Sequence, residues 1–333
     1  MSRRASARAG VLAALAVLLA LVAAGCGGGR AADDGELRLG YFANVTHAAA
    51  IVGLERGVFA RDLPGVKVKG VVFLSGPEAV SALLSGSIDA AYVGPAPVIT
   101  ALSRARGELR TVAGANNGGA LLVARTGTGI RRVADLAHRR VAVPALGNTQ
   151  DLTLRELLRR AGLRATDQGG SVKLIVVKNA QLSAALANHV VDAAMTPEPW
   201  ASGLVHTGEA DVVLGPGRVL GGTYPTTILV VSKALAQKRP DLVARLRRAN
   251  AESVALVARR PGLAAAAFQR MLQESTGKSV DPAVLAAAVR GQTATTTVAR
   301  AGMEVMVAAA ARAGYLARPV ALAEVMPAPQ GAR

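Results

Sequence analysis

Small polar residues and glycines stand at the starts of several predicted helices, where they could bind an anion. The first N–H groups of a helix have no partner within it and carry about half a positive charge, so they can hold anions without Lys or Arg. This pattern predicts ligand contacts at Asn44, Thr46, Ser75, Gly94, Asn148, Thr149 and Gln150, next to expected helices over residues 46–55, 77–84, 97–104 and 149–160.

Some of these residues also have an ordinary structural explanation. Ser75 and Glu78 have the spacing of a capping box, in which each side chain bonds a backbone N–H near the other. Thr149 could be a plain N-cap. The run over residues 147–151, however, holds more polar side chains than one cap requires, which favours a ligand contact there.

Three further residues are candidate ligand contacts with an open alternative. Asn116 and Gly118 lie between two predicted strands, where a simple turn would explain them equally well. Trp200 is the only tryptophan, and it forms either a wall of the ligand site or an anchor in the core. We count all three among the predicted site residues.

The composition excludes several classes of protein. One cysteine among 333 residues rules out a disulfide framework, a cysteine zinc site and an iron–sulfur cluster, and the four histidines lack metal-ligand spacing. The formal net charge is +17, but the basic residues are scattered singly and in pairs, without a basic arm or interleaved aromatic residues. We therefore expect no metal and no nucleic-acid partner.

The N-terminus has the pattern of an export signal followed by a tether. Arginines precede an apolar stretch over residues 11–24, which is too short to span a bilayer. Small residues then lead to Cys26, and this resembles the lipobox of bacterial lipoproteins. We expect residues 1–25 to be a signal peptide, Cys26 to be lipidated, and residues 26–36 to form a flexible tether.

Strands and helices are expected to alternate over residues 37–231, which is typical of a parallel sheet with helices on both faces. The chain then becomes almost wholly helical until a disordered tail over residues 327–333. Residues 82–91 and 185–194 are similar to each other, and each segment follows an apolar strand and precedes a Pro-containing turn. This repeat predicts two similar α/β lobes.

With this organisation, the chain resembles the solute-binding proteins of ABC importers of the nitrate/sulfonate/taurine type, and most closely those that bind aliphatic sulfonates. The resemblance implies a type II periplasmic-binding-protein fold, an α/β fold of two lobes with the ligand cleft between them. It implies a small anionic organic ligand, and ABC permease and ATPase subunits as partners of a monomeric receptor. The segments that carry it are Asn44-Val45-Thr46-His47, Ser75-Gly76-Pro77-Glu78, Gly147-Asn148-Thr149-Gln150-Asp151 and Pro197-Glu198-Pro199-Trp200.

The same resemblance divides the exported chain. Residues 37–124 with 222–326 are expected to form the first lobe, and residues 125–221 the second. The chain would cross between the lobes near residues 124–128 and 221–227. We also include Thr226 among the predicted ligand contacts. The receptor would be exported and held by lipidated Cys26 on the outer face of the cytoplasmic membrane.

Enzyme motifs are poorly represented. Residues 277–279 have the sequence of the end of a P-loop, but Leu272 stands where that motif requires glycine. No G-x-S-x-G nucleophile motif occurs. We expect a binding protein with no catalytic residue and no cofactor, and count His47 as a ligand contact. Because some enzymes of this fold use an active-site histidine, His47 keeps an enzyme as an alternative.

Glu198 lies in the Pro-containing turn after the second repeat copy, so it should face the same cleft as Gly94. A carboxylate there would repel a bare sulfonate, and its burial without a partner would cost about several kcal/mol. The ligand could carry a donor end, an arginine could pair with Glu198, or the carboxylate could point to solvent. We predict the first arrangement, for which an aminosulfonate is suitable; an aminopyrimidine, resembling a thiamine precursor, is the alternative ligand.

Overall fold

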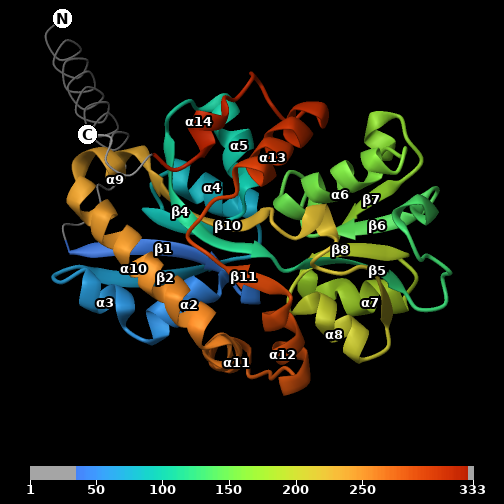
Figure 1. The fold of residues 1–333 in the computed structure, drawn as a ribbon, viewed down its shortest axis with the longest axis horizontal. Coiled ribbons are helices and arrows are strands. Elements are labelled where there is room, and N and C mark those ends of the chain that lie inside the picture. Colours follow the sequence, from blue (N-terminus) through green and yellow to red (C-terminus); the bar gives the residue numbers. More distant parts are fainter. Residues whose placement is uncertain (1–34, 329–333) are drawn as a thin grey trace, which may run out of the picture.

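The computed structural model describes residues 35–328, apart from the side chains of Ser275 and Thr276. It consists of two α/β lobes that lie side by side (Figure 1). The predicted signal peptide, Cys26, most of the predicted tether and most of the predicted tail lie outside the described residues. Within the described part of the chain, no helix is long and apolar enough to cross a membrane.

The first lobe is built on a six-stranded mixed sheet with the order β11-β4-β10-β3-β1-β2. Strand β1 pairs in parallel with β2 and β3, whereas β10 runs antiparallel to β3 and β4, and β11 antiparallel to β4. The strands are β1 (Glu36–Phe42), β2 (Lys67–Phe73), β3 (Ala90–Val93), β4 (Leu109–Gly118), β10 (Pro225–Ser232) and β11 (Gln292–Ala294).

The second lobe repeats this plan in a five-stranded sheet with the order β7-β6-β8-β5-β9. Strand β6 pairs in parallel with β7 and β8, and β5 runs antiparallel to β8 and β9. In each lobe, the strand that arrives from the other lobe, β10 in the first and β5 in the second, runs antiparallel to both of its neighbours. The strands are β5 (Ala120–Arg125), β6 (Arg140–Val143), β7 (Lys173–Val176), β8 (Ala193–Pro197) and β9 (Ala210–Leu214).

The first crossing between the lobes differs from the expectation. It lies at Gly118 and Gly119, between β4 and β5, and not near residues 124–128. Both glycines have positive φ values, 67° and 76°, which L-residues with side chains rarely adopt. Strand β5 therefore belongs to the second lobe, and assigning residues 120–124 to the first lobe was wrong. The second crossing leads from β9 to β10 through residues 215–224.

The helices cover both faces of the two sheets (Figure 1). Several helices begin with proline. Proline is well tolerated at this position, because a backbone N–H there would have no partner within the helix. The helices are η1 (Val45–His47), α2 (Ala48–Glu55), α3 (Val58–Asp62), α4 (Gly76–Leu84), α5 (Pro95–Arg104), η2 (Val133–Leu136), α6 (Thr149–Arg160), η3 (Thr166–Gln168), η4 (Asn179–Gln181), α7 (Leu182–Ala187), α8 (Trp200–His206), η5 (Val219–Gly221), α9 (Lys233–Lys238), α10 (Pro240–Arg259), α11 (Pro261–Thr276), α12 (Pro282–Arg290), α13 (Arg300–Arg312) and α14 (Leu322–Val325).

Among the described residues, one large cluster of buried apolar side chains spans the two lobes on one side of the molecule. Leu102 of α5, Leu152 of α6 and Met306 of α13 belong to a single cluster that spans the lobe boundary. On the opposite side, α2, α10 and α11 enclose a separate core in the first lobe, and α7 and α8 enclose another in the second. In each of these two cores, the apolar faces of the helices cover one face of a sheet and keep water out.

The predicted repeat is confirmed in three dimensions by a pair of matching ion pairs. Asp89, just before β3, accepts hydrogen bonds from the backbone N, Nε and Nη2 of Arg38 at 2.8–3.0 Å. Asp192, just before β8, accepts the same three bonds from Arg140 at 2.9–3.2 Å. In both lobes the aspartate thus holds the start of one parallel strand against its neighbour.

Candidate ligand-binding cleft

A pocket lies between the lobes, at the carboxyl ends of the parallel strands and at the starts of the helices that follow them. Ligands of open α/β sheets bind at this edge. Most of the predicted site residues line it: Asn44, Thr46, His47, Ser75, Gly94, Asn148, Thr149, Gln150 and Thr226.

Helix α6 begins in this pocket with unpaired donors. Asn148 is its N-cap, and its Oδ1 accepts a hydrogen bond of 2.9 Å from the backbone N of Asp151. The N–H groups of Thr149 and Gln150 have no acceptor in the described part of the chain. These two donors lie at the positive end of a three-turn helix, an arrangement whose chemistry suits an anion.

The hydroxyl of Thr149 adds a third donor. Its Oγ1 is buried and makes no hydrogen bond to any described residue, although a buried hydroxyl almost always has a partner. Gly94, at the end of β3 in the first lobe, lies directly opposite. A Cβ atom on Gly94 would lie 2.1 Å from Thr149 Oγ1, so any side chain at position 94 would force Thr149 or the lobes to move.

His47 enters the same pocket as a neutral side chain. Its Nδ1 accepts a hydrogen bond of 3.3 Å from the backbone N of Phe42, and its ring packs against the Phe42 ring at 4.4 Å between centroids. Burial away from water lowers the pKa of His47 to about 3. Because Nδ1 is an acceptor, the remaining proton sits on Nε2, and His47 is a hydrogen-bond donor without charge.

Ser75 also offers a donor, because the capping box that was the alternative explanation for this residue does not form. Its side chain does not cap α4, and Glu78 Oε2 accepts only a long hydrogen bond of 3.4 Å from the backbone N of Leu74. Ser75 is half-buried and lines the pocket, so its hydroxyl can turn to a ligand.

The lining of this pocket contains no Lys, Arg, Asp or Glu. Its polar groups are hydroxyls, amides, one neutral imidazole and backbone N–H groups from both lobes. The cavity volume is about 30 Å³, room for only one or two water molecules. The lobes are therefore closed on each other, and an organic ligand can reach these groups only when the lobes separate.

Asn116 and Gly118 lie at the first crossing, outside the pocket lining. Asn116 Nδ2 donates to the carbonyl O of Gly118 at 3.3 Å and to Oγ1 of Thr226 at 2.9 Å. These bonds tie the end of β4 to β10. Asn116 and Gly118 thus shape the crossing, while Thr226, which is bonded to Asn116, also reaches the pocket.

Glu198 does not take the arrangement that we predicted for it. Its carboxylate accepts hydrogen bonds from the backbone N and the hydroxyl of Ser202, at 3.0 and 2.8 Å, and so caps the start of α8. Burial raises the pKa of Glu198, and its side chain is absent from the pocket lining. Its contact with the first lobe runs instead through its backbone O, which accepts from the N of Val45 at 3.1 Å.

Trp200 bridges the lobes beside the pocket and is half-buried. Its Nε1 donates a hydrogen bond of 2.9 Å to Oδ1 of Asn44, whose side chain lines the pocket.

Sequence reasoning missed Asn179, a lining residue whose Oδ1 accepts from Thr196 Oγ1 at 3.2 Å. Its place between strand β7 and helix α7 follows the same strand-end rule that identified the other residues.

Comparisons with known proteins agree with the fold. A protein of Brucella abortus (strain 2308) that bears the name of a binding protein is 27% identical over 219 residues. The match covers 65% of this chain and 65% of that protein, slightly under two thirds of its length.

Among solved structures, the alkanesulfonate-binding protein SsuA from Xanthomonas axonopodis pv. citri, bound to MOPS, is similar with a TM-score of 0.74 and 22% identity. The match covers 89% of this chain and 99% of SsuA. The desulfurization enzyme DSZB is similar too, with a TM-score of 0.64 and 19% identity over 89% of this chain and 97% of that one. The two-lobe fold predicted from the sequence is confirmed. The model of the NMT1-like family matches residues 30–272, and the chain belongs to this family.

Proposed function

We propose that this protein is an extracytoplasmic receptor that captures a small organic anion of the sulfonate type for an ABC importer. The observation that carries this proposal is the pocket, in which both lobes direct neutral hydrogen-bond donors at one point without any charged side chain. The family, and the likeness to an alkanesulfonate-binding protein, support it.

The donor set favours the anion of a strong acid. Such an anion keeps its charge at physiological pH and offers several oxygen acceptors. The N–H groups of Thr149 and Gln150, Thr149 Oγ1 and His47 Nε2 would all be satisfied by them. Hydrogen bonds to a charged acceptor contribute about 1.5–3 kcal/mol each. An aminopyrimidine is not favoured, because the lining offers no carboxylate and Glu198 is bonded to Ser202.

The pocket chemistry supports binding over catalysis, although an enzyme shares the fold. A general acid or base works best with a pKa near the ambient pH. His47 is the only His, Asp, Glu, Lys or Cys in the pocket lining, and its pKa of about 3 makes it a very weak base at neutral pH. The proposed mechanism is reversible closure: the lobes separate, an anion binds, and the closed form docks on the permease.

The proposed location is the outer face of the cytoplasmic membrane, with lipidated Cys26 as the anchor. The sequence pattern around Cys26 supports this, and it is the only cysteine in the chain. On this account, Cys26→Ala releases the protein from the membrane fraction.

A ligand panel tests the proposed function. We expect calorimetry to show saturable binding of short alkanesulfonates such as butanesulfonate, and much weaker binding of the matched alkylamines. Mass spectrometry should recover the sulfonate unchanged after long incubation. Preference for the amine, or conversion of the sulfonate, would overturn the receptor assignment.

A further inference from the structure

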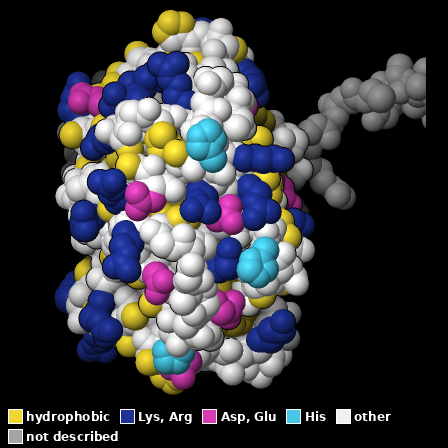
Figure 2. Space-filling view, turned by 90° about the vertical axis from the view of Figure 1, so that its right-hand side faces the viewer, with side chains coloured by type: hydrophobic (Ala, Val, Ile, Leu, Met, Phe, Trp, Pro, Cys, Tyr) yellow, Lys and Arg dark blue, Asp and Glu magenta, His cyan; other side chains and the backbone are white. Residues whose placement is uncertain are grey.

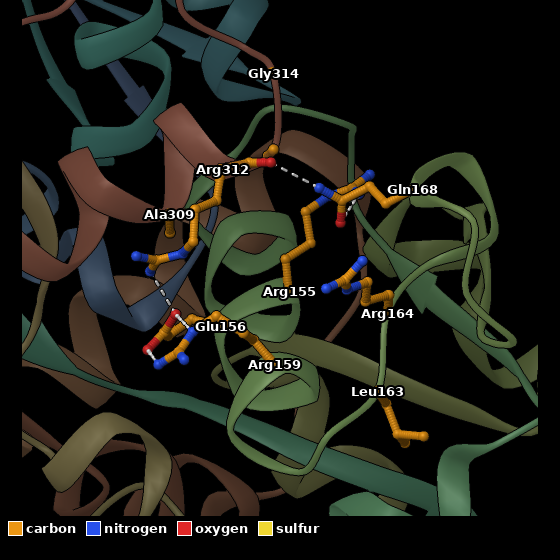
Figure 3. A pocket seen from close by; sticks show the side chains of 10 residues that line it. Arg155, Glu156, Arg159, Leu163, Arg164, Gln168, Ala309, Arg312 and Gly314 are labelled. Atoms are coloured by element: carbon orange, nitrogen blue, oxygen red, sulfur yellow. Dashed lines mark hydrogen bonds and ion pairs between the residues drawn. The ribbon is translucent and has the colours of Figure 1, made fainter.

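A second cavity lies between the lobes, away from the ligand pocket, and it is rich in arginine. It has a volume of about 460 Å³. The second lobe lines it with α6 and the segment that follows, and the first lobe lines it with α13 (Figure 3). Its polar lining residues are Arg155, Glu156, Arg159, Arg164, Gln168 and Arg312.

Glu156 is the only acidic residue in this lining. Its buried carboxylate accepts hydrogen bonds from Arg159 at 2.9 Å, from Arg160 at 2.9 Å and from Arg312 at 2.6 Å. These guanidinium groups lower the pKa of Glu156 to about 2, so it is ionised throughout the physiological range. One carboxylate nevertheless cannot neutralise three guanidinium groups, and several of their N–H donors stay unpaired.

The other two arginines differ from each other. Arg155 is buried and fully engaged, because it donates hydrogen bonds to oxygens of Asp151, Asp167, Gln168 and Tyr315. Arg164 makes no hydrogen bond or ion pair through its side chain with any other described residue. Its side chain extends from the loop after α6 back toward that helix (Figure 3). Arg164 thus adds a guanidinium group to the cavity whose donors have no partner among the described residues.

The surrounding surface does not explain this concentration of charge. Over the end of the second lobe, Lys and Arg side chains are scattered, with acidic side chains between them (Figure 2). A pure interlobe latch of Glu156 and Arg312 would also not require an open volume beside it. Guanidinium groups are planar, weakly hydrated forks that match phosphate and carboxylate oxygens.

We propose that this cavity is a second anion site, which binds a small polyanion through phosphate or carboxylate oxygens. Arg159, Arg164 and Arg312 supply the free donors, and Arg155 holds α6 in place through its own network. Because α6 belongs to the second lobe and α13 to the first, a polyanion bound there bridges the lobes and favours their closed arrangement. This proposal goes beyond the ligand pocket, which the opposite end of α6 lines.

The experiment uses inorganic pyrophosphate as the probe, with the whole mature protein and calorimetry at low ionic strength. We expect saturable binding to the wild type, and an affinity at least fivefold weaker in Arg164→Gln. Arg164 is the sharpest choice because its side chain has no partner to lose. The matched control is Arg248→Gln, an exposed arginine on α10 whose side chain likewise lacks a partner among the described residues; it should leave the affinity unchanged.

A cleft variant separates the two cavities. Thr149→Val should leave pyrophosphate affinity within twofold of the wild-type value, because Thr149 is absent from the arginine-rich lining. Absence of saturable binding would overturn the proposal. So would equal losses in Arg164→Gln and Arg248→Gln, which would indicate diffuse surface attraction, or a loss confined to Thr149→Val, which would place the anion in the ligand pocket.

Discussion

Gly94 in the first lobe and Thr149 in the second are in such close contact that a methyl group on Gly94 would lie 2.1 Å from Thr149 Oγ1. Gly94 has φ −68° and ψ 153°, a conformation open to any residue, so backbone strain does not require glycine there. The requirement comes from the other lobe. Glycine at this position is what allows the pocket to close.

Gly94→Ala should therefore hinder closure without harming either lobe. We expect ligand affinity to fall at least tenfold, about 1.4 kcal/mol, with little change in thermal stability. Calorimetry and thermal unfolding would check the two effects. Gly262→Ala is the matched control, since a Cβ there meets no atom within 4 Å, and it should keep full affinity. Equal affinity in the two variants would mean that closure does not bring these residues together.

Thr149→Val removes the buried hydroxyl while keeping the shape of the side chain. We expect affinity for an organic anion to fall about tenfold, in line with one lost hydrogen bond to a charged acceptor. The free energy of unfolding should change by less than about 0.5 kcal/mol, because no protein partner is lost.

Thr153→Val supplies the comparison for that change. Thr153 is on the same helix, is buried, and also has a hydroxyl with no partner among the described residues, but it does not line the pocket. Its variant should bind like the wild type. A similar loss in both variants would point to a general effect on α6 and against a ligand contact at Thr149.

Asn148→Asp should distinguish the two roles of this residue, capping α6 and lying next to the proposed anion. Aspartate is as good an N-cap as asparagine, so the bond to the N of Asp151 is kept and α6 stays intact. The added negative charge next to the free N–H groups should weaken anion binding by about 1–3 kcal/mol, and most at low salt. Calorimetry at two ionic strengths measures this. Unchanged affinity at low salt would show that the anion does not bind at the start of α6.

Burial of neutral His47 predicts a specific dependence of stability on pH. The unfolded chain takes up a proton as pH falls below about 6.5, whereas the pKa of folded His47 is about 3. As pH falls from about 6.5 to about 3, the free energy of unfolding should therefore drop by about 1.4 kcal/mol for each pH unit. Above about pH 6.5, the neutral His47 should cost the folded protein no stability. Ligand affinity should stay flat from pH 5 to 8, because His47 remains neutral.

Denaturant unfolding of the wild type and His47→Asn between pH 7 and 4 would check this. The amide oxygen of asparagine can still accept from the N of Phe42, but it does not titrate. The stability difference between the two proteins should shrink steadily as pH falls. Parallel curves would show that His47 takes up its proton in the folded protein as well.

The sequence was sufficient for the two lobes because the repeat reflects a local unit. Each copy contains a strand, a helix and an aspartate that pairs with a neighbouring strand, and all of this lies within about 50 residues along the chain. Helix starts with small polar residues identified most of the pocket for the same reason, since strand ends and helix starts meet at one edge of a sheet.

The remaining errors concern contacts that sequence spacing does not determine. Strand β5 is short and apolar, and nothing in its residues shows which sheet it joins; that depends on the turn made by Gly118 and Gly119. Glu198 was expected to face a ligand, but Ser202 lies one helical turn further on and takes its carboxylate. The i, i+4 spacing of this pair was the available signal.

The most direct test of the central claim is small-angle X-ray scattering of the mature protein during titration with butanesulfonate. The account predicts that the free protein in solution is on average more open than the closed arrangement described above, so that binding produces a saturable decrease in the radius of gyration, with full reversal on dialysis. Saturable binding of the sulfonate with an unchanged radius of gyration would contradict it.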